Sequence, residues 1–285
     1  VTHRDSPVTR PGGERYNMIF RQVVFYALLV GTLSGLVLTV AQVWQVVPII
    51  HSAEVFEEVS ASVPAIESAG QLAAAHDHSA ATNEWAPANG IERTAYTLLS
   101  NVLTAIGFAI VMMVAMMASH SLRRNDKPRF DWRTGLTWGV AGYMVFWLAP
   151  AIGLPPEIPL AATADLEARQ IWWLFAVIST AAGLAGLAFG KSPWRWAAPF
   201  LLVVPHLVGA PHVAGAMFAE QSPAAAVQLE QLAQQFIGAT AIANFAFWIA
   251  LGLIASWAVK RIVASTRSES NSDRAVNPEI KLPSI

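Results

Sequence analysis

The sequence predicts an all-α, polytopic membrane helix bundle with about six transmembrane helices and both termini in the cytoplasm. Three observations support this fold class. Hydrophobic residues make up 54% of the 285 residues and charged residues only 13%, about half the share found in soluble domains. The apolar residues gather in long runs, and basic residues gather on alternate sides of those runs. Such a chain carries too little polar surface for a soluble protein of this length.

Six apolar segments are candidate membrane spans, because a helix needs about 20 mostly apolar residues to cross the hydrocarbon core. Five of them reach that length. The exception is the segment 197–211, which is short and contains Pro205, a residue that removes a backbone donor from a helix. The five long segments are 23–50, 94–118, 134–154, 171–190 and 236–259.

Arginine and lysine give the orientation, since they accumulate on the cytoplasmic side of membrane proteins. Sixteen of the 18 basic residues lie before the first segment, between the second and third, between the fourth and fifth, or after the last. The intervening stretches 51–92 and 212–235 carry none, and Arg93 and Arg169 remain at loop edges. This alternation predicts six crossings, with 51–92 as an extracytoplasmic loop.

The two ends of the chain are polar and are predicted to be disordered. Residues 1–17 would form an N-terminal extension, with Met18 a candidate for the natural start, and 260–285 a cytoplasmic tail. The transmembrane domain would then span 18–259. Pairs of glycines four residues apart predict close helix packing. These pairs are Gly31 with Gly35, Gly135 with Gly139, and Gly186 with Gly190.

The predicted outer loop is the first candidate for metal chemistry. It holds acidic residues and three histidines, and imidazole and carboxylate are good ligands for divalent cobalt, nickel and zinc. His76 and His78 flank Asp77 and could chelate one ion in an extended segment. His51 and Glu54 could converge on a helical continuation of the first span. An ordinary solvated acidic loop with incidental histidines explains the same residues.

His206 is the second candidate, because an ionisable side chain at membrane depth is costly and marks function by default. It lies in "PHLVGAPH", between Pro205 and Pro211. A short segment interrupted by proline and glycine is a pointer to a transporter's binding site. His212 follows six residues later and shares no helical face with His206 unless the helix breaks. Packing of His206 against a neighbouring helix is an equally open interpretation.

Three further side chains are candidates for an ion pathway. Asn101 and Asn244 fall inside predicted spans, where buried amides also join helices by hydrogen bonds. Glu157 is held among prolines near the membrane and could serve as a gate or ligand. In the same loop, Asp165 and Arg169 are spaced to pair on one helix. The following Trp172 and Trp173 would lie in an interfacial aromatic belt. The methionines at 112, 113, 116 and 117 are expected to pack against lipid or in the core.

Several function classes find no support in the chain. There is no cysteine, which excludes thiolate metal sites and cysteine nucleophiles, and the net charge of −1 does not point to nucleic acid. "GLAFGKS" lacks the first glycine of a nucleotide-binding loop, no HExxH is present, and "GTLSG" is not a nucleophile elbow. The sequence therefore gives no support for an enzyme.

Four segments together resemble the CbtA family of cobalt transporter subunits. They are "RQVVFYALLVGTLSGLVLTVAQVWQVVPIIHSAEVFE", "EWAPANGIERTAYTLLSNVLTAIGFA", "GLPPEIPLAATADLEARQIWW" and "PHLVGAPH", in the family's order. The resemblance covers about 18–259. It implies a multi-pass member of a cobalt uptake system in the bacterial cytoplasmic (inner) membrane, feeding cobalamin synthesis together with a small His-bearing membrane protein of the same system.

The resemblance implies no permanently bound cofactor, with Co²⁺ as cargo, and puts His206 and the His76–His78 loop on the ion's route. Nickel in place of cobalt stays open, because the two ions accept the same ligands. A non-transporting scaffold or a metal-sensing role stays open as well. So do the energy coupling, a partner ATPase and a homo-oligomer.

Overall fold

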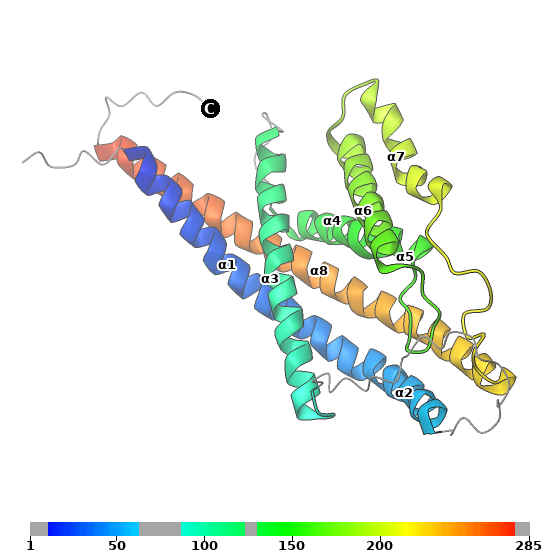
Figure 1. The fold of residues 1–285 in the computed structure, drawn as a ribbon. Coiled ribbons are helices and arrows are strands. Elements are labelled where there is room, and N and C mark those ends of the chain that lie inside the picture. Colours follow the sequence, from blue (N-terminus) through cyan, green and yellow to red (C-terminus); the bar gives the residue numbers. More distant parts are fainter. Residues whose placement is uncertain (1–10, 63–86, 123–129, 277–285) are drawn as a thin grey trace, which may run out of the picture. The chain divides into compact units, whose positions relative to one another are not determined.

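The computed structural model describes residues 11–62, 87–122 and 130–276, and every regular element in these ranges is helical (Figure 1). The sequence prediction of an all-α chain is confirmed. The elements are α1 (Pro11–Ala41), the π-helical segment η1 (Gln42–Val46), α2 (Val47–Ser62), α3 (Ile91–Leu122), α4 (Trp132–Tyr143), the π-helical segment η2 (Met144–Leu148), α5 (Ala149–Gly153), α6 (Leu166–Phe189), α7 (Trp194–Val208) and α8 (Pro223–Val276).

Five helices of the described ranges are long and apolar enough to cross a membrane, as the sequence predicts for its five long segments. They are Asn17–Val59, Ile91–His120, Trp132–Gly153, Leu166–Phe189 and Pro223–Ser268, the first and third being continuous through η1 and η2. The predicted short sixth segment is also helical, as Arg195–Val208. The architecture is therefore that of a multi-pass membrane protein.

The helices reach further than the sequence prediction at three places. α8 continues through 260–276, where a disordered tail is expected from 260, and α1 starts at Pro11 inside the predicted extension. α2 extends to Ser62, into the predicted loop. Contacts with α1 explain the extension of α8: Ile262 is buried, and the Ser265 hydroxyl donates to Gln22 Oε1 at 2.9 Å.

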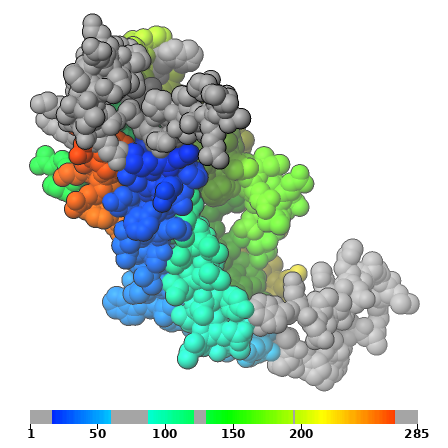
Figure 2. Space-filling model, turned by 90° about the vertical axis from the view of Figure 1, so that its left-hand side faces the viewer, coloured from blue at the N-terminus to red at the C-terminus, as the bar shows by residue number. Residues whose placement is uncertain are grey.

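The chain divides into two compact units, each built from discontinuous parts. Unit 1 comprises the described parts of 1–37, 101–144 and 245–285. Its helices meet at glycines: a Cβ on Gly31 or Gly35 would collide with α3 at Ile106 or Val102, so α1 and α3 lie in backbone contact (Figure 2). Gly139 and Gly252 bring α4 and α8 together in the same way. The predicted role of the glycine pairs in close packing is confirmed here.

The methionines of α3 belong to the core of unit 1. Met113 and Met116 are fully buried and Met112 is 5% exposed. This burial agrees with the packing interpretation.

Unit 2 comprises the described parts of 38–100 and 145–244, and it contains the hairpin of α6 and α7 (Figure 1). Near the end of α6, Gly183 and Gly186 face Ala198 at the start of α7. Near the start of α6, Trp172 meets His206 at the end of α7. The two helices are thus antiparallel, and α7 returns the chain to the end where α6 begins. With 15 residues, α7 is about 22 Å long, shorter than the ~30 Å hydrocarbon core.

A second feature of unit 2 is a small apolar cluster that ties four segments together. Ile158 follows α5, Phe218 follows α7, Ala53 comes from α2, and Leu229 and Ala233 come from α8. The stretches 51–92 and 212–235, which carry no basic residue, therefore meet the 155–160 loop at one end of this unit. Burial of Ile158, at 4% exposure, holds the loop on which the neighbouring Glu157 is carried.

Candidate functional site

The most distinctive polar arrangement in unit 2 lies between α6 and α7. The rings of Trp172 and His206 meet edge to face, with centroids 6.1 Å apart. Trp172 is 5% exposed, and Trp172 Nε1 and His206 Nδ1 are both buried without a hydrogen-bond partner in the described part of the chain. Such groups are costly unless something satisfies them. Thr180 Oγ1, further along α6, is in the same condition.

Sequence reasoning placed Trp172 in an interfacial aromatic belt, and that prediction is wrong. Its ring fills the space beside Gly153, where a Cβ would collide with it, and Ala210 lies next to the same position. Trp173, one residue on, is half-buried and faces Phe146, with ring centroids 6.5 Å apart. Because successive helical residues point in different directions, only one of two adjacent tryptophans can enter the α6–α7 interface.

α7 does not break at Pro205, where the sequence predicts an interruption. It runs through both Pro199 and Pro205 and ends at Val208. Gly209 then takes a positive φ of 84°, and its N–H donates to the Pro205 carbonyl at 3.1 Å. Pro205 still has no N–H for the Leu201 carbonyl, and the helix end leaves carbonyls of the last turn without partners in the helix. His206 therefore lies in the last turn of a helix, where backbone carbonyls lack partners within the helix.

His212 lies apart from this arrangement. Its side chain is exposed, and its Nδ1 donates to the Ala210 carbonyl. It follows the positive-φ Gly209 and precedes the irregular segment that leads to α8. The two histidines of "PHLVGAPH" thus make different contacts, one with an aromatic ring of α6 and one with its own backbone.

The predicted convergence of His51 and Glu54 is present in α2. His51 Nδ1 donates to Glu54 Oε2 at 3.1 Å. The same carboxylate also takes two hydrogen bonds from Arg93 of α3, from Nη2 to Oε1 at 2.6 Å and from Nη1 to Oε2 at 3.2 Å. This two-point ion pair neutralises the carboxylate and competes with any cation for its oxygens.

Glu157 is paired as well. Arg169 Nη2 donates to Glu157 Oε2 at 2.6 Å, and both side chains are less than a third exposed. The expected pair of Asp165 with Arg169 does not form: Asp165 instead caps α6, its Oδ1 accepting from the Ala168 N–H at 3.0 Å. An N-cap carboxylate is fixed by local backbone geometry. Arg169 therefore pairs with Glu157, which the preceding loop places beside it.

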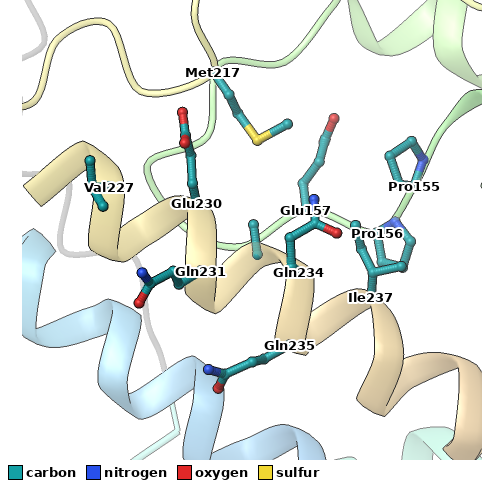
Figure 3. Close-up of a pocket in the computed structure, with 11 residues that line it drawn as sticks. Pro155, Pro156, Glu157, Met217, Val227, Glu230, Gln231, Gln234, Gln235 and Ile237 are labelled. Carbon is teal, nitrogen blue, oxygen red and sulfur yellow. The ribbon is translucent and has the colours of Figure 1, made fainter.

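Beside Glu157 lies a pocket of about 690 Å³, formed by the 155–157 loop, Met217 and the first part of α8. Figure 3 shows Glu157 and Glu230 both extending toward the side of the pocket on which Met217 lies. Gln231 and Gln234 add amide groups from α8. The pocket thus offers two carboxylates, one of them already paired, together with amide oxygens and a thioether.

The remaining candidates divide between described and undescribed parts of the chain. Asn244 Nδ2 donates to the Thr240 carbonyl of its own helix at 2.9 Å, and Asn101 lies half-buried on α3. His76, Asp77 and His78 lie outside the described residues. Within the described ranges, no group of three or more His, Asp or Glu side chains is arranged to hold a metal ion.

The family model described as "Probable cobalt transporter subunit (CbtA)" matches residues 20–260. The chain belongs to the CbtA family. No curated protein and no solved structure matches it. The matched range contains every described candidate residue. It begins after the start of α1 and stops before the end of α8.

Membership of the CbtA family gives a coarse function: one component of a transporter, with a non-enzymatic role and, as the family description implies, a partner. The structure adds three residues to the candidates of this CbtA member: Arg93, Trp172 and Glu230. Spacing could have found Glu230, since it shares a face of α8 with Val227 and Gln234. No sequence signal pairs Arg93 with Glu54, because the two lie 39 residues apart.

Proposed function

We propose that this chain is the membrane component through which a divalent cobalt ion, or nickel in its place, enters the cell, supplying cobalamin synthesis. The observation that carries the proposal is the buried Nδ1 of His206 in the last turn of α7, which has no hydrogen-bond partner among the described residues. Imidazole is a good ligand for these ions. An ionisable side chain within a membrane segment is a functional-site hypothesis by default.

The ion would move by weak, successive contacts. No three-ligand group exists among the described side chains, so the ion would keep part of its water shell and take one imidazole and backbone carbonyls at a time. Weak binding suits conduction, since an ion must be able to leave each site. An inside-negative potential favours a cation by ~2.3 kcal/mol per charge per 100 mV, and roughly twice that for a divalent ion.

The route would begin at the exterior end of unit 2. His76, Asp77 and His78 would collect the hydrated ion, and the acidic pocket of Glu157 and Glu230 would raise its local concentration. His51 would lie along the approach, and Asn244 could offer an amide oxygen further on. The small His-bearing protein of the same system, in the same bacterial inner membrane, would present or receive the ion.

Uptake of radioactive cobalt into proteoliposomes tests the proposal, with the chain alone and with its small His-bearing partner. We expect His206→Ala to lower the initial rate at least about tenfold, equivalent to ~1.4 kcal/mol. The matched control is His212→Ala, which removes an exposed imidazole only six positions away and should stay within about twofold, well under that energy.

Two outcomes would contradict transport through this chain. Uptake by His206→Ala equal to that of the unaltered chain would remove His206 from the route. No uptake by the unaltered chain, with or without the small His-bearing partner, would favour the alternative of a non-transporting scaffold or metal sensor. The observation that supports this alternative is the lack, among the described residues, of a group of three metal-ligating side chains.

A further inference from the structure

A second pocket, of about 990 Å³, lies in unit 1 between the start of α1 and the last part of α8. Its lining combines two kinds of side chain. Arg21, Gln22, Arg261 and Ser265 supply polar groups, whereas Phe25 and Leu28 supply an apolar wall that continues along α1. Among the described residues, no histidine or carboxylate lines it, so it differs in chemistry from the ion route proposed above.

Contacts between the two helices give this pocket a defined wall. The Ser265 hydroxyl donates to Gln22 Oε1 at 2.9 Å, which joins α8 to α1 at the polar side. The guanidinium carbon of Arg261 lies 5.7 Å from the ring centroid of Trp257. That ring in turn meets Tyr26 edge to face, with centroids 5.8 Å apart. The aromatic pair therefore orients Arg261 at the pocket.

The charged side chains described in unit 1 are mostly basic. Among the described side chains of unit 1, five are Lys or Arg: Arg21, Arg133, Lys260, Arg261 and Arg267. The one carboxylate in that set is Asp131, which accepts hydrogen bonds from the Thr134 N–H and hydroxyl at the start of α4. Two guanidinium groups, with no carboxylate among the described lining residues, predict an anionic occupant.

The apolar side of the pocket narrows the choice of anion. Phe20 is 68% exposed, Phe25 64% and Leu28 49%, so the described chain leaves a large apolar surface of α1 uncovered. A free phosphate ion would use only the arginines. A molecule with a phosphate head and hydrocarbon chains would cover both parts, since the planar guanidinium fork matches phosphate oxygens.

We propose that this pocket binds an anionic glycerophospholipid, with its phosphate between Arg21 and Arg261 and its acyl chains along Phe20, Phe25 and Leu28. Basic pockets between transmembrane helices hold anionic lipid headgroups in this manner. The lipid would brace the N-terminal part of α1 against the far part of α8, where Ser265 and Gln22 make the direct contact.

Native mass spectrometry of the delipidated full chain in detergent, with added phosphatidylglycerol or phosphatidylcholine, tests the proposal. The unaltered chain should retain phosphatidylglycerol at least about fivefold more than phosphatidylcholine, as expected when charge decides binding. Arg21→Gln/Arg261→Gln should abolish that preference. Arg267→Gln is the matched control, because it removes an exposed arginine of α8 that does not line the pocket, and it should retain the preference.

Further measurements test the proposal even if the double variant misfolds. Retention by the unaltered chain should fall as salt is raised, because Coulomb attraction is screened; retention unchanged by salt would overturn the proposal. Arg21→Lys/Arg261→Lys should keep part of the preference. Equal retention of the two lipids by the unaltered chain would also overturn the proposal. So would equal retention of phosphatidylglycerol by Arg21→Gln/Arg261→Gln and by the unaltered chain. Complete displacement by inorganic phosphate at equal concentration would show an ion site instead of a lipid site.

Discussion

Trp172 and His206 face each other across the α6–α7 hairpin with ring centroids 6.1 Å apart, and each carries a buried nitrogen that no described group satisfies. The indole N–H can only donate, whereas His206 Nδ1 can accept in one tautomer. A metal ion can therefore bind the histidine but not the tryptophan. This asymmetry makes His206 the candidate ligand and Trp172 the side chain that holds its surroundings in place.

The first prediction separates function from packing at His206. His206→Leu replaces a half-buried ring with an unsatisfied nitrogen by an apolar side chain. Removing an unpartnered polar group is close to neutral or stabilising, so we expect thermal unfolding in detergent at an equal or higher temperature, while cobalt uptake is lost. Trp172→Ala is the comparison, and should cost about 3–5 kcal/mol. Destabilisation of His206→Leu similar to that of Trp172→Ala would mean that His206 serves packing.

The second prediction concerns close helix contact in unit 1. Gly139→Ala places a Cβ 2.6 Å from the Trp248 carbonyl oxygen, a backbone atom that cannot turn aside. We expect destabilisation of about 1–3 kcal/mol, as for other overpacked sites. The control is Gly107→Ala on α3, where no atom lies within 4 Å of the new Cβ; it should be neutral or gain up to about 1 kcal/mol from helix propensity. Equal melting temperatures of the two variants would contradict the contact.

The third prediction tests whether Arg93 blocks metal binding by His51 and Glu54 in the first half of α2. Arg93→Gln would release the Glu54 carboxylate beside His51. In a His76→Ala/His78→Ala background, we expect Co²⁺ to bind at least about threefold more tightly, or ~0.7 kcal/mol. Calorimetric titration measures the change. Adding Glu54→Gln should cancel the gain, and a gain that persists without Glu54 would exclude this pair as its source.

The fourth prediction concerns acid stability at the start of α4. Hydrogen bonds from the Thr134 N–H and hydroxyl hold the pKa of Asp131 below its usual 3.8. Since the folded pKa is lower than the unfolded one, the stabilisation is complete above the unfolded value and is lost as pH falls below about 4 through the folded pKa. Asp131→Asn keeps a good N-cap but does not titrate.

We therefore expect the difference in melting temperature between the native chain and Asp131→Asn to be constant from neutral pH down to about pH 5, and to shift against the native chain at lower pH. Circular dichroism of both proteins across this range measures it. A difference that stays the same down to about pH 2, below the usual carboxyl pKa, would mean that the Asp131 carboxylate contributes nothing by its charge.

Much of the fold could be predicted from the sequence because it depends on local properties. The length of an apolar run decides whether a helix can cross the membrane, and the five long segments were located on that basis. Glycines four residues apart predicted close approach because only their spacing on one helix matters. The predicted helix ends were less accurate than the predicted helices, because tertiary contacts such as that of Ser265 with Gln22 extend α8 beyond its apolar run.

The sequence by itself determined that this is a helical membrane protein with a short, proline-containing segment, and it singled out His206. Only the tertiary structure decided which groups meet: Arg169 with Glu157 in place of Asp165, Arg93 with Glu54, and Trp172 with His206. The physical reason is that a helical cap or a hydrophobic run is set by residues a few positions apart. An ion pair or ring contact between distant segments exists only after the helices have packed.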